Sequence, residues 1–174
     1  AVYSGQDTTM DKCRFYDNES NIIGAVLFSG EKTSLTNSIF IGNADKEFSG
    51  AVAFAGKSSS ENHVVINNNL FAKNHSQSGS AALFLSTFER LSIINSTIVD
   101  NSSSSNIGAV FVAGNYIYSH EIHILNSVIR GNTQYGEPQI QSTIPIRSLL
   151  IEYSNLEGVW ASALEPGFGN IDED

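Results

Sequence analysis

The sequence predicts an all-β fold, a parallel β-helix (solenoid) of about six coils with 25–31 residues per coil and little or no α-helix. Three observations predict it: a repeat runs through nearly the whole chain, short strand-like runs alternate with polar turns, and aligned copies show columns of like residues. Such self-similarity indicates units that bury their apolar sides by stacking on one another. A β-sandwich would need hairpin signals, and leucine-rich repeats would need a Leu-rich consensus.

The first strand-like element of each period follows the pattern Gly-Ala-Val or a close variant. Its copies occupy 1–3, 24–28, 50–54, 81–84 and 108–111, and each is followed within a few residues by Gly, Ser or Asn. These runs are short and rich in Val and Phe, which favour strands. No window keeps the 3.6-residue period of an amphipathic helix. We expect the insertions at 57–61 and 102–105 to be loops that protrude from one corner of the coil.

The second element has an apolar residue, then a small polar residue after three positions, an apolar or aromatic residue after five and Asn after eight. Its full copies are 35–43, 66–74, 93–101 and 124–132, with a degenerate copy at 10–18 and a partial copy from 151. Successive copies begin 25, 31, 27, 31 and 27 residues apart. Strands of stacked coils lie roughly 4.8 Å apart, so equivalent residues of neighbouring copies contact one another.

Stacking of these copies predicts four columns. Two are apolar and form the core: Met10, Leu35, Ile66, Ile93, Ile124 and Ile151, and Phe15, Phe40, Phe71, Ile98, Ile129 and Leu156. One holds small residues, with Cys13 as a buried small side chain in place of Ser: Cys13, Ser38, Asn69, Ser96, Ser127 and Ser154. The last is a structural asparagine ladder that satisfies the amides of the bends: Asn18, Asn43, Asn74, Asn101 and Asn132.

Length and composition limit the organisation of the chain and the classes of partner. The 174 residues suit a single β-helix domain, with regular coils in 1–139 and the last coil and closing segment in 140–174; we expect it to be a piece of a longer chain. A net charge of −9 argues against nucleic acid and anionic membranes as partners. No run of about 18 apolar residues is present, so no membrane insertion is expected. The single cysteine excludes a disulfide framework and a multi-cysteine zinc site.

Two parts of the sequence resemble known families. The Gly-Ala-Val motif combined with Phe-x-x-Asn at 15–18, 40–43 and 71–74 resembles the repeat of bacterial polymorphic outer-membrane proteins, which are autotransporter adhesins with a β-helical passenger. The region 124–174, ending in Gly-Asn-Ile-Asp-Glu-Asp, resembles secreted bacterial β-helix proteins of the choice-of-anchor type, although it departs from their pattern at 158–160. The resemblance implies right-handed winding, export and an extracellular or cell-surface location.

Catalytic and metal-binding patterns are weak in this chain. A glycoside hydrolase needs two or three carboxylates on neighbouring strands, whereas the acidic residues here are scattered among turns, so no catalytic residue is predicted. Lys73 and Asp100 share one column and are expected to form an exposed ion pair. His120 and His123 flank Glu121 but alternate in side on a strand, so we interpret them as surface residues rather than metal ligands.

The closing segment holds the remaining binding candidates. Asp172 and Asp174 are weak candidates for a Ca²⁺ site, and no other cofactor is expected. Tyr153, Trp160 and Phe168 form a candidate platform for stacking sugar rings. The alternative interpretation is that these aromatic residues cap the end of the solenoid core.

Three functional hypotheses follow. The first is a non-enzymatic structural or adhesive module of a secreted or cell-surface bacterial protein, with cell-surface glycan and other parts of its own longer chain as partners. The second treats the segment as the C-terminal coils of a polysaccharide lyase or glycoside hydrolase, by analogy of fold alone. The third is a subunit of an extracellular filament whose copies stack end to end through unpaired strand edges.

Overall fold

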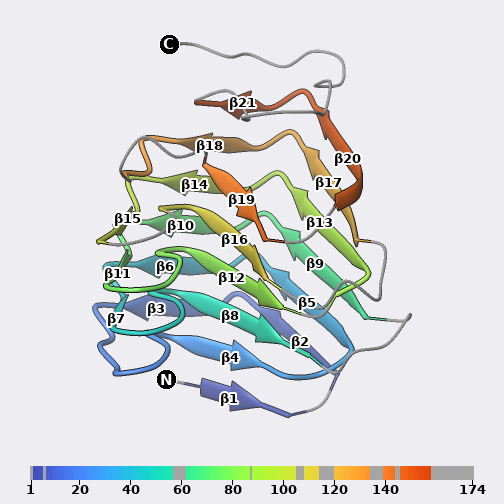
Figure 1. The fold of residues 1–174 in the computed structure, drawn as a ribbon. Helices are drawn as coiled ribbons and strands as arrows, with labels where there is room; N and C mark the ends of the chain where they lie inside the picture. The colour runs from blue at the N-terminus through green and yellow to red at the C-terminus, as the bar shows by residue number, and fades with distance from the viewer. Residues whose placement is uncertain are drawn as a thin grey trace.

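The computed structural model describes residues 2–5, 7–56, 62–86, 88–104, 108–113, 120–133, 139–143 and 146–157. This part of the chain is all-β and contains no helix, so it holds none that is long and apolar enough to cross a membrane. Its strands form a parallel solenoid of about five turns (Figure 1). The predicted fold class is therefore confirmed.

Three long sheets and one short sheet form the walls of the solenoid, and every strand pairing is parallel. Sheet A contains β1 (Val2–Ser4), β4 (Val26–Phe28), β8 (Val52–Ala55), β12 (Leu83–Ser86), β16 (Val110–Ala113) and β19 (Ile140–Ser142). Sheet B contains β2 (Thr8–Asp11), β5 (Lys32–Thr36), β9 (His63–Asn67), β13 (Arg90–Ile94), β17 (His120–Leu125) and β20 (Ile146–Glu152).

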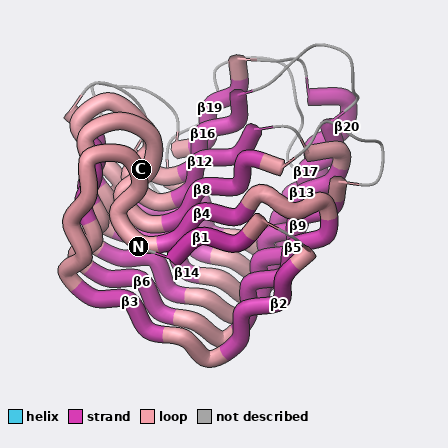
Figure 2. The backbone as a smooth tube through the Cα atoms, turned by 90° about the horizontal axis from the view of Figure 1, so that it is seen from below, coloured by secondary structure: helices cyan, strands magenta, loops and turns pink. Residues whose placement is uncertain are grey.

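The other two sheets complete each coil. Sheet C contains β3 (Arg14–Tyr16), β6 (Ile39–Ile41), β10 (Leu70–Ala72), β14 (Thr97–Val99), β18 (Val128–Arg130) and β21 (Asn155–Leu156). The short sheet D contains β7 (Ala44–Asp45), β11 (His75–Ser76) and β15 (Ser102–Ser103). Viewed from the N-terminal end, the chain passes clockwise through A, B and C as it moves away from the viewer (Figure 2), so the winding is right-handed.

The core consists of the two predicted apolar columns and the inward residues of sheet A. The strand register pairs Phe15 with Phe40, Phe40 with Phe71 and Phe71 with Ile98. The three phenylalanine rings stack nearly parallel, with centroids 4.9 and 5.0 Å apart. Leu35, the neighbour of Met10 in the other column, is fully buried. Successive coils thus place each large side chain against its own equivalent, which explains the repetition of residue types.

Two corner columns have a left-handed backbone, on either side of sheet C. One holds Lys12, Asn37, Asn68, Asn95, Asn126 and Tyr153, and the other holds Asp17, Gly42, Lys73, Asp100 and Gly131. Asn, Asp and Gly tolerate positive φ better than other residues, so their recurrence marks these corners. An added Cβ at Gly131 would lie 2.7 Å from Asp100 Oδ1, which shows that this carboxylate points along the solenoid toward the following coil.

Two local predictions were wrong. No ion pair joins Lys73 to Asp100 among the described residues, because both lie at a left-handed corner and the Asp100 carboxylate is directed toward Gly131 instead. The loop expected at 102–105 contains β15, whose two serines pair with His75 and Ser76 of β11. The insertion at 57–61 lies outside the described residues.

Candidate functional site

An asparagine column runs along the inside of the corner between sheets C and D. After Asn18, the first member, each side-chain Oδ1 accepts two hydrogen bonds from the preceding asparagine, one from its backbone N–H and one from its Nδ2. For the Asn43–Asn74 pair these distances are 2.9 and 3.0 Å, and the same pattern joins Asn18, Asn43, Asn74, Asn101 and Asn132. Asn132 then exchanges amide hydrogen bonds with Gln139, at 2.7 and 3.1 Å, which ends the column.

A second polar column fixes the corner between sheets B and C. The backbone N–H of each member donates to the side chain of the next: Cys13 to Ser38, Ser38 to Asn69, Asn69 to Ser96, Ser96 to Ser127 and Ser127 to Ser154, at 2.8–3.2 Å. Cys13 is half-buried and lies at one end of this column. Both columns satisfy buried backbone donors that no strand pairing reaches, so they support a rigid backbone rather than chemistry on a substrate.

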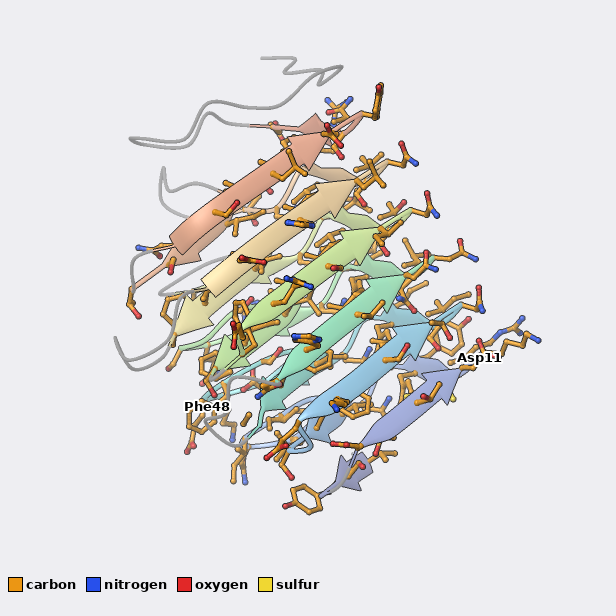
Figure 3. The ribbon with its side chains drawn as sticks, turned by 90° about the vertical axis from the view of Figure 1, so that its right-hand side faces the viewer. Asp11 and Phe48 are labelled. Atoms are coloured by element: carbon orange, nitrogen blue, oxygen red, sulfur yellow. The ribbon has the colours of Figure 1, made fainter. Side chains whose placement is uncertain are left out.

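The outward face of sheet B is largely polar and varied. Figure 3 views this face, with Asp11 labelled on β2; Phe48, also labelled, belongs to the loop between β7 and β8 and packs on sheet A rather than on sheet B. One outward column places Lys32, His63, Arg90 and Glu121 on successive strands. The guanidinium of Arg90 donates twice to Glu121 Oε2, at 3.0 and 2.9 Å. Asn37 and Thr36 donate to the Asp11 carboxylate, and these hydrogen bonds lower the pKa of Asp11.

One outward column of sheet A is mostly apolar and partly aromatic before it reaches Gln141 on β19. Its register aligns Tyr3, Leu27, Ala53, Phe84 and Phe111 on successive coils. Ala53 is buried although it faces outward. Phe48, from the loop after β7, packs edge-on against Phe84, with ring centroids 5.6 Å apart. Phe84 in turn contacts Phe111, at 5.8 Å. We call Tyr3, Leu27, Phe48, Phe84 and Phe111 the aromatic strip.

The loop that carries Phe48 is held by a buried carboxylate. Asp45 is only 3% exposed, and its Oδ2 accepts hydrogen bonds from the backbone N–H groups of Glu47, Phe48 and Ser49 at 2.6–3.0 Å. Burial raises the pKa of Asp45, and these N–H donors and the Ser76 hydroxyl offset part of that effect. The loop therefore has a defined conformation although Phe48 itself is 44% exposed.

The backbone of Phe48 is also tied to both neighbouring coils. Its N–H reaches the carbonyl of Ile22 on one side, and its carbonyl accepts from Ser80 on the other, both at 3.1 Å. A Cβ added at Gly79 would lie 2.1 Å from the Phe48 carbonyl oxygen, so only glycine allows this close approach. These contacts place Phe48 next to the aromatic residues of sheet A.

The residues proposed from the sequence for ligand binding do not form one site. Tyr153 is 63% exposed and occupies the left-handed corner between sheets B and C, where four other coils carry Asn. Its proposed partners Trp160 and Phe168, and the candidate calcium ligands Asp172 and Asp174, lie outside the described residues. In the part of the chain that the structure describes, no three His, Cys, Asp or Glu residues gather as metal ligands.

The aromatic strip was not predicted from the sequence. The signal was present, because Phe84 and Phe111 occupy the same position in the Gly-Ala-Val element of their copies. The position of Phe48 could not be predicted from the sequence pattern, since it depends on the path of a loop between two sheets. Comparisons of the chain with protein-family models, with curated proteins and with solved structures found no match.

Proposed function

We propose that this chain is a non-enzymatic structural and adhesive module of a secreted or cell-surface bacterial protein. The observation that carries the proposal is the pairing of a rigid scaffold with a solvent-facing strip of large apolar side chains. Exposure of aromatic side chains to water is unfavourable, and contiguous apolar patches on the surfaces of soluble proteins in general mark interaction sites. Secretion and bacterial origin rest on the repeat resemblance and remain part of the proposal.

The scaffold suits adhesion because it holds its surface groups at fixed spacing. Each coil contributes the same backbone at a rise of roughly 4.8 Å, and the polar columns at both corners of sheet C pin that backbone from coil to coil. A rigid array loses little conformational entropy on contact, so weak interactions repeated along the rod add up.

Adhesion is tested by binding of the purified protein to arrays of bacterial and host surface glycans and extracellular proteins. We expect saturable binding to at least one class, retained after immobilisation in either orientation. Absence of binding to every class would leave only the structural role.

The enzymatic alternative is tested with the same protein on a panel of polyuronates and neutral polysaccharides. Lyase activity would appear as absorbance of unsaturated products, and hydrolase activity as new reducing ends. We expect neither, because the outward carboxylates of the described strands are spread over sheet B: Asp11 and Glu152 lie on its first and last strands, and Glu121 is held in an ion pair with Arg90. Turnover of any panel member would overturn the non-enzymatic proposal.

A further inference from the structure

Building on the proposed adhesive function, we propose that the aromatic strip is a binding site for a linear, uncharged glycan that lies along the solenoid axis. The strip is one side chain wide and follows successive coils, from Tyr3 on β1 to Phe111 on β16. A ligand that contacts all of it must therefore be extended along the rod.

The rings of the strip are arranged differently from the rings of the core. The inward rings stack in the core: Phe28 and Phe54 of sheet A at 16°, and Phe15, Phe40 and Phe71 of sheet C within 8° of parallel. The outer rings make no such stack: Phe48 meets Phe84 at 62°, and Phe84 meets Phe111 at 59°. Phe48 is displayed on a loop that requires a buried carboxylate, and burying a charge is unfavourable.

The coil of β8 also displays an aromatic ring, although its outward strand residue is small. On β8 the outward residue is Ala53, and on this coil it is the loop residue Phe48 that supplies a ring, in contact with Phe84 of the next coil. Two unrelated devices, a strand position and a hydrogen-bonded loop, thus place aromatic rings on consecutive coils. This continuity favours one extended ligand over separate contacts.

The chemistry beside the strip points to a glycan and against a charged polymer. No member of the strip is charged, and the only charged residues in the Phe48 loop are Lys46 and Glu47, which have opposite signs. A parallel column of small residues, Ala55, Ser86 and Ala113, lies next to it on sheet A, and Ala55 is exposed. The C–H faces of pyranose rings pack on aromatic faces, while a net charge of −9 repels uronates and sulfated glycans.

The test is isothermal titration calorimetry of the full chain with cellohexaose, xylohexaose and mannohexaose, and with hexagalacturonate as the acidic probe. We expect at least one neutral hexasaccharide to bind and the acidic one to bind at least tenfold more weakly. Phe84→Ala should lower the affinity for the neutral hexasaccharide about tenfold, because it removes a central aromatic contact. Binding of hexagalacturonate alone, or of none of the four, would overturn the inference.

Two further variants separate binding from folding. Ala55→Lys adds a long charged side chain at an exposed position beside the strip and leaves every ring in place. It should therefore lower the affinity for the glycan without changing the thermal unfolding curve. Tyr16→Ala removes an aromatic ring that is 48% exposed on sheet C and should leave affinity unchanged. An equal loss of glycan affinity in the two variants would show that the binding site is not the aromatic strip.

The outcomes also distinguish this inference from the broader function. Glycan binding that survives both Phe84→Ala and Ala55→Lys would reject the strip and retain adhesion. Light scattering of the free protein measures its oligomeric state and so tests the competing occupant of the strip, a second copy of the chain. A wild-type dimer that Phe84→Ala converts to monomer would show that the strip is a self-association surface and would overturn the glycan assignment.

Discussion

Inward columns and outward columns of the solenoid follow different rules. On sheet C the inward column keeps a large apolar residue on all six strands, and the first three are phenylalanines in a ring stack. On sheet B the outward column changes from strand to strand: Thr9, Ser34, Val65, Ser92, His123 and Leu150. The backbone geometry is equivalent in both cases, so the difference arises from what each side chain contacts.

An inward residue contacts its equivalents on the coils above and below, and a change in one coil leaves a void or a clash in two others. An outward residue contacts water on one side, and its contacts with the next coil, such as the Arg90–Glu121 ion pair, do not require the same residue type on both coils. Repetition of residue type is therefore evidence of structure in this molecule. Function is better sought where large apolar residues follow one another in an outward column without that coupling, as Phe84 and Phe111 do on sheet A.

The largest expected effect is in the core stack. Phe40→Ala removes a fully buried ring between Phe15 and Phe71 and should lower the free energy of unfolding by about 3–5 kcal/mol. Phe84→Ala removes a ring of the same size from the outward face, where the partly exposed cavity fills with water, and should cost about 1 kcal/mol. Urea unfolding of both variants at pH 7 measures the difference; equal losses would mean that the outward ring is structural.

The asparagine ladder offers the same comparison for polar groups. Asn74→Ala leaves buried, without their partners, the backbone N–H and Nδ2 of Asn43 and the carbonyl of Phe40. Each such group costs about 1–3 kcal/mol, so we expect a loss of about 3 kcal/mol or more. Asn18→Ala, at the half-exposed end of the ladder, removes no acceptor for a preceding asparagine and should cost about 1 kcal/mol. Similar losses of stability in the two variants would argue that the ladder does not stabilise the fold by satisfying buried hydrogen-bonding groups.

These contrasts also explain how much could be predicted from sequence. The six-membered column from Met10 to Ile151 appears in the strand register as expected, because a fixed period and alternation along a strand determine which residues stack. The backbone conformation of the corners was harder to predict. A left-handed backbone at Asn37, Asn68, Asn95 and Asn126 has a clear signature in the recurring Asn, whereas Lys73 at an equivalent corner carries none, and the expected ion pair with Asp100 failed there.

The candidate site was harder to predict than the fold. Phe84 and Phe111 could be assigned to the outward side only after the inward side of sheet A was known. Phe48 joins them through a loop whose path depends on three backbone hydrogen bonds to Asp45 and on the absence of a side chain at Gly79. No short-range pattern encodes that combination of contacts from separate coils.

Asp45 gives a pH-dependent test of the Phe48 loop. Its pKa in the folded protein is raised above the ordinary value of 3.8 by burial, so the folded state binds more protons than the unfolded state between the two values. Stability from this group is therefore present below 3.8 and is lost as the pH rises through the raised pKa. Asp45→Asn keeps an acceptor oxygen without the charge, and it should gain stability relative to wild type as the pH rises from 3 to 7.

The comparison must be between the two proteins at each pH, because hydrogen bonds lower the pKa of Asp7 and Asp11, and these two contribute stability with the opposite sign. Asp45→Ala is the matched variant, since it also removes the acceptor for three N–H groups. It should lose about 1–3 kcal/mol at pH 7 and show a weaker fluorescence or NMR signature of a packed Phe48. A wild-type minus Asp45→Asn difference that is flat with pH would contradict the assigned burial effect.

The smallest expected effect is at the ion pair on sheet B. Arg90 and Glu121 approach to 2.9 Å, but the arginine side chain is 49% exposed, so solvent and salt screen their attraction. Glu121→Gln should cost about 0.2–1 kcal/mol in low salt and less in 1 M NaCl, where charges are screened within roughly 3 Å. Asn74→Ala should show no such salt dependence, because its lost contacts are buried amides. A salt-insensitive loss at Glu121 above 2 kcal/mol would mean that an outward pair couples coils as strongly as an inward one, and the distinction between the two kinds of column would fail.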